Sequence, residues 1–125
     1  MSEPVKGQWA EGELSLEARQ LTGEVRVTWR GRSSDREPGR FLLPVLSQLV
    51  ESCRRSSCRL CLDFAPLEYM NSSTFTPVVK AIDEARRAGV PIALEYSQAK
   101  KWQALSFSAL RTFETADGSV TVLGR

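Results

Sequence analysis

Four small polar side chains in a row, Asn71-Ser72-Ser73-Thr74, are the residues of this sequence best placed to do chemistry. They follow an apolar segment at 60–64 and precede apolar residues at helical spacing, so they stand where a helix begins. A helix N-terminus presents unpaired backbone N–H groups and the positive end of the helix dipole. A serine there can cap the helix, bind an anion or carry a phosphate, and the pattern leaves these alternatives open.

Other catalytic chemistry has few side chains available. The chain of 125 residues contains no histidine, which removes Ser-His-Asp and Cys-His arrangements. Neither a P-loop nor a Gly-x-Gly-x-x-Gly motif occurs. Asp63 ends an apolar segment, and we interpret it as an acid that caps the following loop. We therefore expect a protein that is not an enzyme, with no catalytic residues and no cofactor.

Three cysteines, Cys53, Cys58 and Cys61, lie close together along the chain. Cys53 is expected to end a helix, while Cys58 and Cys61 are three apart on a strand and should point to opposite faces. Neither a histidine nor a second cysteine pair supplies a fourth metal ligand. The sequence predicts three buried thiols and no metal site.

Composition and charge favour one ordinary compact domain. The chain is 42% hydrophobic and 26% charged, and its net charge of +2 is too small to indicate nucleic-acid binding. The arginines from Arg26 to Arg40 are interrupted by Asp35 and Glu37, so we interpret them as a solvated face. Since no apolar run approaches the ~20 residues that span a bilayer and no signal peptide is recognisable, we expect a cytoplasmic protein without membrane contact.

Hydrophobic periodicity predicts the elements that position the four polar residues. Strands are expected at 13–18, 24–30, 59–64, 91–96 and 120–123, the first two as a hairpin. Helices are expected near 41–53, 75–88 and 102–113, with Pro44 in the first turn of the first helix. Pro77 predicts that regular helix begins only near Thr76, which leaves Ser72 and Ser73 in an irregular first turn.

The order of these elements predicts an α/β fold. Strands that alternate with helices form right-handed crossovers with parallel pairing, so we expect a mixed sheet of four or five strands with about three helices mainly on one face. Trp9 indicates that residues 1–11 form an N-terminal extension or an edge strand. The main domain is then expected at residues 12–125.

The segment from Leu60 to about Phe113 resembles a STAS domain, the fold of bacterial anti-sigma-factor antagonists. The family pattern has an apolar strand ending in Asp, a short loop, Asp-Ser-Ser-Gly or Asp-Ser-Thr-Gly at a helix start, and Ala-Gly before the next strand. Its counterparts here are residues 60–63, residues 71–74 and Ala88-Gly89. The chain departs from the pattern at Asn71 and Thr74, where the family has Asp and Gly. Asn-Ser-Ser at 71–73 together with Trp-Gln-x-x-Ser at 102–106 is similar to a narrower group of STAS-like regulators.

The resemblance implies a STAS-like fold and a partner-switching function. In such antagonists a serine kinase, which is also the anti-sigma factor, phosphorylates the first serine after the acidic position, and a phosphatase restores the complex. By position that serine is Ser72, and Ser73 is the alternative acceptor. We expect a protein partner at Asn71, Ser72, Ser73 and Thr74, and a homo-oligomer stays open.

Trp102 and Gln103 extend the expected docking surface. Trp102 follows two lysines at a predicted helix start, where a large aromatic side chain can stay exposed and anchor an interface. The sequence thus favours a signalling module that docks a protein partner. The alternatives are a constitutive scaffold or assembly subunit without a phosphate switch, and binding of a nucleotide or anion at the helix start with help from Arg86 or Lys80.

Overall fold

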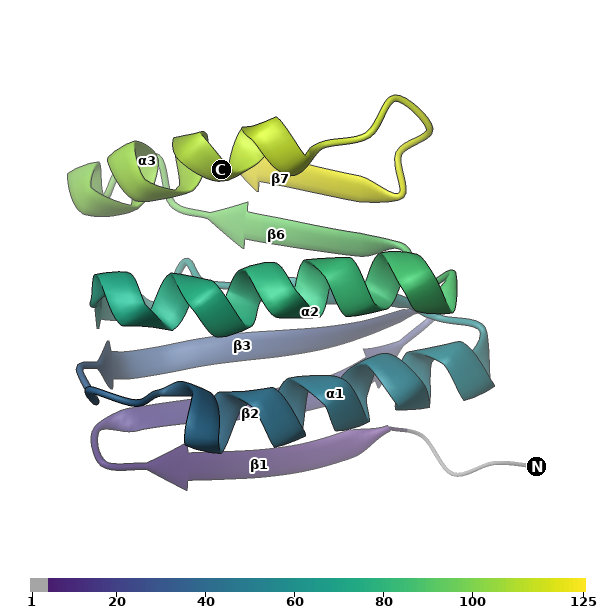
Figure 1. The fold of residues 1–125 in the computed structure, drawn as a ribbon, viewed down its shortest axis with the longest axis horizontal. Coiled ribbons are helices and arrows are strands. Elements are labelled where there is room, and N and C mark those ends of the chain that lie inside the picture. Colours follow the sequence, from purple (N-terminus) through teal and green to yellow (C-terminus); the bar gives the residue numbers. More distant parts are fainter. Residues whose placement is uncertain (1–4) are drawn as a thin grey trace.

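Strands and helices alternate along most of the chain (Figure 1). The computed structural model describes residues 5–125. Its strands are β1 (Lys6–Glu11), β2 (Leu14–Leu21), β3 (Glu24–Ser33), β4 (Arg59–Asp63), β5 (Leu67–Met70), β6 (Ile92–Tyr96) and β7 (Val120–Gly124). Its helices are α1 (Gly39–Ser56), α2 (Phe75–Ala88) and α3 (Lys101–Ser108), with short 3₁₀ helices η1 (Ser72–Thr74) and η2 (Ala109–Phe113).

The strands form one mixed sheet in the order β1-β2-β3-β4-β6-β7, with β5 paired to β3. β1, β2 and β3 are antiparallel neighbours, and the remaining pairs are parallel. Helices α1 and α2 lie side by side across one face of the sheet, while α3 runs beside β6 and β7 (Figure 1). The predicted α/β fold with three helices is therefore confirmed.

The predicted number of strands is too low, since the sheet has seven. β1, which contains Trp9, forms an edge of the sheet. β5 has only four residues and pairs with β3 beyond the end of β4, across an irregularity between Gly31 and Arg32. Because a segment this short carries almost no periodicity, the sequence predicts a loop where the structure has β5.

The core lies between the sheet and the helices. Alternation in β2 and β3 turns Leu16 and Trp29 inward, where both are buried. The helices contribute stripes at three- and four-residue spacing, which are Leu42, Val45, Leu46 and Leu49 from α1 and Val78, Ala81, Ile82 and Ala85 from α2. Burial of such apolar surface is the main favourable term in folding.

Helix α1 is longer than its apolar stripe. It begins at Gly39, so Pro44 lies in the second turn and not, as predicted, in the first. The Leu42 amide donates to the Pro38 carbonyl (2.9 Å). This first helical hydrogen bond starts ahead of the apolar stripe, so the helix also includes the polar residues before it. At the other end Ser57 adopts φ 55°, and the Cys58 amide closes the helix on the Cys53 carbonyl (3.0 Å).

Candidate functional site

The four predicted polar residues, which we call the helix mouth, lie between β5 and α2. Asn71 has extended backbone and caps η1, because its Oδ1 accepts hydrogen bonds from the Thr74 amide (3.1 Å) and the Thr74 hydroxyl (2.7 Å). Regular helix begins at Phe75, one residue before the predicted Thr76. The predicted irregular first turn is confirmed as η1.

Asn71 and Thr74 also tie the helix mouth to the end of β3. The Thr74 hydroxyl lies 2.7 Å from the Ser33 hydroxyl, and both side chains are buried. The Asn71 amide donates to the Ser33 carbonyl (2.9 Å), and its Nδ2 donates to the Asp35 carbonyl (2.8 Å). An aspartate at position 71, as in the STAS pattern, has no Nδ2 donor. The asparagine found here therefore adds a hydrogen bond to the β3–α1 loop.

Ser72 and Ser73 are both exposed, unlike Asn71 and Thr74 beside them. Within residues 5–125 neither hydroxyl makes a hydrogen bond to the protein. No acidic residue lies in the first turn of α2, so the positive end of its dipole has no carboxylate in that turn. The two hydroxyls are therefore available for modification or contact, whereas the fold already uses Asn71 and Thr74.

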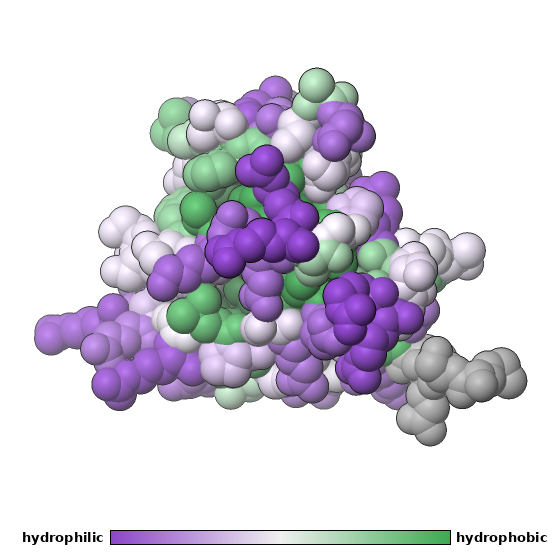
Figure 2. All heavy atoms as spheres, turned by 45° about the vertical axis from the view of Figure 1, so that its right-hand side comes forward, coloured by the Kyte–Doolittle hydropathy of each residue, from purple (hydrophilic) through white to green (hydrophobic). Residues whose placement is uncertain are grey.

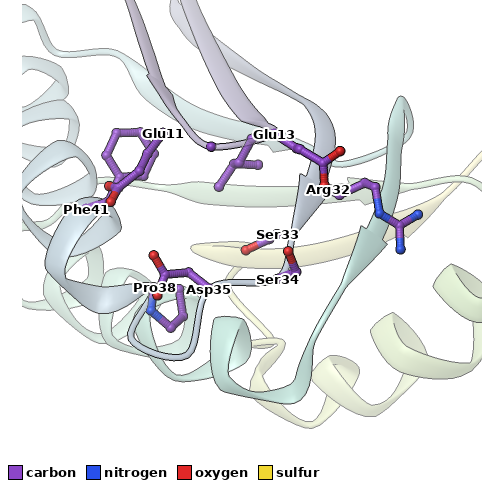
Figure 3. A pocket seen from close by; sticks show the side chains of 10 residues that line it. Glu11, Glu13, Arg32, Ser33, Ser34, Asp35, Pro38 and Phe41 are labelled. Atoms are coloured by element: carbon purple, nitrogen blue, oxygen red, sulfur yellow. The ribbon is translucent and has the colours of Figure 1, made fainter.

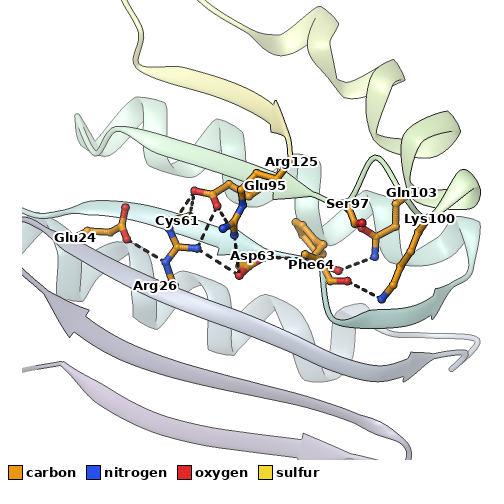
Figure 4. Close-up of polar contacts among 11 residues, drawn as sticks. Glu24, Arg26, Cys61, Asp63, Phe64, Glu95, Ser97, Lys100, Gln103 and Arg125 are labelled. Carbon is orange, nitrogen blue, oxygen red and sulfur yellow. Dashed lines mark hydrogen bonds and ion pairs between the residues drawn. The ribbon is translucent and has the colours of Figure 1, made fainter.

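The structure places Gln103 inside the molecule, with no exposed surface. Its Oε1 accepts from the Ser97 amide (2.7 Å), and its Nε2 donates to the carbonyls of Phe64 (2.7 Å) and Leu67 (2.9 Å) (Figure 4). Lys100 donates to the Ala65 and Leu67 carbonyls at 2.6 and 3.1 Å. Gln103 and Lys100 thus hold the β4–β5 loop that leads to the helix mouth, and Gln103 has no surface to offer a partner.

Trp102 is half-buried. It lies near the helix mouth, because its ring and the ring of the first residue of α2 pack near the same side chain, Phe107. Its ring centroid is 6.4 Å from that of Phe107, and the ring of Phe75, the first residue of α2, is 5.8 Å from the same ring. Leu105, three residues further along α3, is 77% exposed, more than any other large hydrophobic side chain in residues 5–125. The starts of α2 and α3 therefore share one side of the molecule.

A second polar cluster, which we call the sheet-face cluster, comprises Glu24, Arg26, Cys61, Asp63, Glu95 and Arg125 (Figure 4). Arg26 pairs with both Glu95 oxygens at 3.1 Å and with Asp63 at 3.3 Å. Arg125 pairs with Glu95 at 2.6 Å and with Asp63 at 3.2 Å. Asp63 and Glu95 are opposite residues on adjacent strands, so two arginines compensate two neighbouring carboxylates.

Burial and hydrogen bonding act in opposite directions on the pKa of Glu95. Burial favours the neutral form of Glu95, but hydrogen bonds from Arg26 and Cys61 and the charges of both arginines outweigh it and lower its pKa. The hydrogen bond with Glu95 is the main cause of the raised pKa of Arg26. Asp63 also accepts from the Ala65 amide at 3.0 Å, which confirms its predicted loop-capping role.

All three cysteines are free and buried, which confirms the prediction for the thiols. Burial raises the pKa of Cys53 to about 12. Cys61 donates to Glu95 at 3.1 Å, whereas Cys58 accepts from Gln20 at 3.4 Å. Within residues 5–125 no group of three or more Cys, Asp or Glu side chains has an arrangement that could hold a metal ion.

The end of the molecule opposite the helix mouth has a different surface. The last turns of α1 and α2 carry Arg54, Arg55, Arg86 and Arg87, which suits the negative ends of the helix dipoles. Figure 2, in which this end is turned toward the viewer, shows hydrophilic residues beside patches of hydrophobic residues. Arg86 stands roughly 16 Å along α2 from Phe75, so it is too far away to assist the anion site at the helix start that the sequence left open.

Comparison with known proteins identifies the fold. No family model and no curated protein matches the chain. The crystal structure of apo-SiaC from Pseudomonas aeruginosa matches with a TM-score of 0.65 at 17% identity, covering 99% of both chains. The crystal structure of the diguanylate cyclase SiaD in complex with its activator SiaC, from the same organism, matches with a TM-score of 0.62 at 18% identity, covering 94% of this chain and 98% of that chain.

A third solved structure extends the comparison. An anti-sigma factor antagonist from Mycobacterium paratuberculosis matches with a TM-score of 0.55 at 14% identity, covering 85% of this chain and 90% of that one. Within residues 5–125 no helix is both long and apolar enough to cross a membrane. The sheet order, the helix placement and these neighbours together show that the chain has the STAS-like fold of SiaC and of anti-sigma-factor antagonists.

Proposed function

We propose that this protein is a non-enzymatic, cytoplasmic signalling module that docks a protein partner at the helix mouth and is switched by phosphorylation of Ser72, with Ser73 as the alternative acceptor. One observation carries the proposal. The hydroxyls of Ser72 and Ser73 are exposed and unbonded within residues 5–125 at the start of a 14-residue helix, while Asn71 and Thr74 beside them are bonded into the fold. A kinase can reach these hydroxyls without disturbing the cap.

A phosphate at this position changes the surface and leaves the fold intact. Phosphoserine carries nearly two negative charges, which the positive end of α2 accommodates. The hydrogen bonds that hold the turn come from Asn71 and Thr74, so none of them has to break. A partner that buries the helix mouth must remove water from this dianion, and its affinity is expected to fall.

The neighbouring structures support a partner-binding role. SiaC is the activator of the diguanylate cyclase SiaD in the complex of the two proteins, and the mycobacterial protein is an anti-sigma factor antagonist. A shared fold alone does not carry function from one protein to another, so the role here rests on the helix mouth. The partners we propose are a serine kinase of the anti-sigma type and an opposing phosphatase.

The proposed docking surface comprises Asn71, Ser72, Ser73, Trp102 and Leu105. Trp102 offers apolar area near the start of α2, since its ring and that of Phe75 both pack near Phe107, and Leu105 is exposed one turn further along α3. Thr74 and Gln103 are fully buried and support this surface from below.

The test is an affinity capture from native cell lysate with four baits: wild type, Ser72→Ala, Ser72→Asp and Ser57→Asp. Ser57 is an exposed serine at the C-terminal end of α1, the end of the molecule opposite the helix mouth, so its variant adds the same charge far from the proposed docking surface. A partner lost only with Ser72→Asp supports the switch. A partner retained by all four baits contradicts it and supports a constitutive scaffold or assembly subunit.

The modification itself needs a separate measurement. Protein purified from its native cells is digested and its peptides are analysed by mass spectrometry. We expect phosphate on the peptide that contains residues 71–74, at Ser72 or Ser73. Phosphate on Thr74 would contradict the structure, because that hydroxyl is buried and bonded to Asn71 and Ser33.

A further inference from the structure

A pocket of about 310 Å³ opens beside the helix mouth (Figure 3). One wall is the turn between β1 and β2, with Glu11, Gly12 and Glu13. The opposite wall is the loop after β3, which includes Asp35 and Pro38. We call this cavity the hairpin pocket. Its volume is at the lower end of the range for small-molecule sites, and it can hold one large side chain.

The lining of the hairpin pocket combines negative charge with apolar surface. Glu11, Glu13 and Asp35 line it, and none of them has an ion-pair partner within residues 5–125. Leu14, Pro38 and Phe41 supply apolar walls. The combination suits a cation on an apolar stem, whose charge meets the carboxylates while its methylene groups contact the hydrophobic side chains.

Among the described residues that line the pocket only Arg32 is cationic, and its guanidinium is directed elsewhere. Its guanidinium lies over the Tyr69 ring, 4.8 Å from the ring centroid. In Figure 3 this group points away from the other labelled side chains. The pocket carboxylates therefore have no internal counter-charge from Arg32.

Several backbone contacts hold the pocket open in this shape. The Asn71 Nδ2 donates to the Asp35 carbonyl (2.8 Å), and the Asp35 carboxylate accepts from the Glu37 amide (2.9 Å). On the hairpin side the Arg32 amide donates to the Glu13 carbonyl (3.1 Å). Gly31 has φ +85°, and a Cβ there would lie 1.9 Å from the Glu13 carbonyl oxygen, so the close approach of the two strands requires glycine.

We propose that the hairpin pocket receives an arginine side chain of the protein partner that docks at the helix mouth. This inference depends on the proposed function in one respect, namely that the arginine belongs to a protein that docks at the helix mouth. A guanidinium is favoured over an ammonium because its planar fork pairs with carboxylates from two directions and stacks on an aromatic ring, here Phe41. The bond from Asn71 to Asp35 joins the pocket and the helix mouth into one continuous surface.

The test uses the full chain and a defined probe, N-acetyl-arginine methylamide, in an NMR titration at low salt. The matched control probe is N-acetyl-citrulline methylamide, which has a neutral side chain of the same shape. We expect the arginine probe to shift the amide resonances of Gly12, Leu14, Ser34 and Asp35. The citrulline probe should bind at least about fivefold more weakly, as expected for the loss of two partly exposed ion pairs. Absence of these shifts, or equal binding of the two probes, would overturn the proposal.

A pair of double variants locates the charge that is responsible. Glu11→Gln with Asp35→Asn removes two pocket charges, and Asn at position 35 can still accept the bond from the Glu37 amide. Glu51→Gln with Asp83→Asn removes two exposed charges on α1 and α2 and serves as the control. We expect about fivefold weaker binding of the arginine probe by the first variant and no change by the second. Equal weakening by both would show that only net charge matters and would contradict a specific site.

The pocket and the phosphate switch fail in distinguishable ways. If Ser72→Asp keeps its partner while the arginine probe still shifts the pocket residues, the switch is wrong and the pocket stands. If Ser72→Asp loses its partner while the probe shifts nothing, the switch stands and the pocket proposal is wrong.

Discussion

The sheet-face cluster and the helix mouth both gather polar side chains, but they differ in how many of their atoms are already bonded. Arg26, Asp63, Glu95 and Arg125 satisfy one another through at least five ion pairs or hydrogen bonds. At the helix mouth, Asn71 and Thr74 are hydrogen-bonded into the fold, while the hydroxyls of Ser72 and Ser73 have no partner within residues 5–125. Charged side chains that satisfy one another support the fold, whereas small polar side chains left free at a helix start are available for function.

Removal of Arg26 is expected to have the largest effect on stability. Arg26→Ala leaves Asp63 and Glu95 adjacent with only Arg125 to compensate them. We expect a loss of about 3 kcal/mol, the low end for a broken buried ion pair, because the Arg26 side chain is 27% exposed. Urea unfolding measures this loss. The control is Arg30→Ala on the same strand, for which we expect less than about 0.5 kcal/mol; an equal loss in both variants would contradict a specific role for the cluster.

Gln103 is expected to come next, because it supports the helix mouth from inside. Gln103→Leu keeps most of the volume but leaves the Ser97 amide and the Phe64 carbonyl without their side-chain partner. We expect a loss of about 2 kcal/mol in free energy of unfolding. Gln98→Leu, at an exposed glutamine with one side-chain bond to Gly124, should cost far less. A stable Gln103→Leu that selectively loses a partner would restore Gln103 to the docking surface.

The stability difference between wild type and Arg26→Ala should depend on pH. In the wild type the lowered pKa of Glu95 means that its contribution is present above the unfolded pKa of about 4.3 and is lost as pH falls through the folded pKa. Without Arg26, burial dominates and Glu95 protonates more readily, so acid harms the variant less. We expect the difference to narrow by about 1–2 kcal/mol between pH 7 and pH 4, measured by urea unfolding at each pH. A difference that widens in acid would contradict this assignment.

The two roles of Asn71 can be separated by two substitutions. Asn71→Ala removes both the cap and the bond to Asp35, and we expect a loss of about 1 kcal/mol in thermal or urea unfolding. Asn71→Asp keeps an acceptor for Thr74 and loses only the Nδ2 donor, so its loss should be about half as large. Equal losses would show that the cap contributes nothing beyond the Asp35 bond.

The serines should give the smallest effect on stability. Ser72→Ala and Ser73→Ala remove exposed hydroxyls without partners in the described part of the chain, so we expect changes below about 0.5 kcal/mol in urea unfolding. Ser72→Asp should be equally stable, because a carboxylate is favourable at a helix N-terminus. A loss above about 1 kcal/mol for either alanine variant would assign that serine to the fold and not to a switch.

Much of the fold was predictable because it follows local periodicity. The alternation in β2 and β3, the stripes in α1 and α2 and the stop at Gly89 all act within a few residues. The failures have physical reasons of two kinds. β5 is too short to show a period, and the polar residues before the apolar stripe of α1 extend the helix beyond what hydrophobicity marks.

The roles of the individual site residues were less predictable than the location of the site. The motif at 71–74 marked the helix mouth, and Pro77 marked its irregular turn. Nothing local distinguishes Thr74, which bonds Ser33 from 41 residues away, from Ser73 beside it. Lys100 and Gln103 likewise act on carbonyls at least 33 residues earlier in the chain.

The sequence by itself determined that polar hydroxyls stand at the start of a helix after a buried strand, because helix starts, apolar stripes and turn residues are local properties. Only the tertiary structure decided which of those hydroxyls are free, that Gln103 is internal, and that Arg26 meets Glu95 across 69 residues. Strand pairing brings such residues together, and burial then forces each polar atom to find a partner. The side chains left exposed after that pairing, Ser72 and Ser73, are the ones we assign to function.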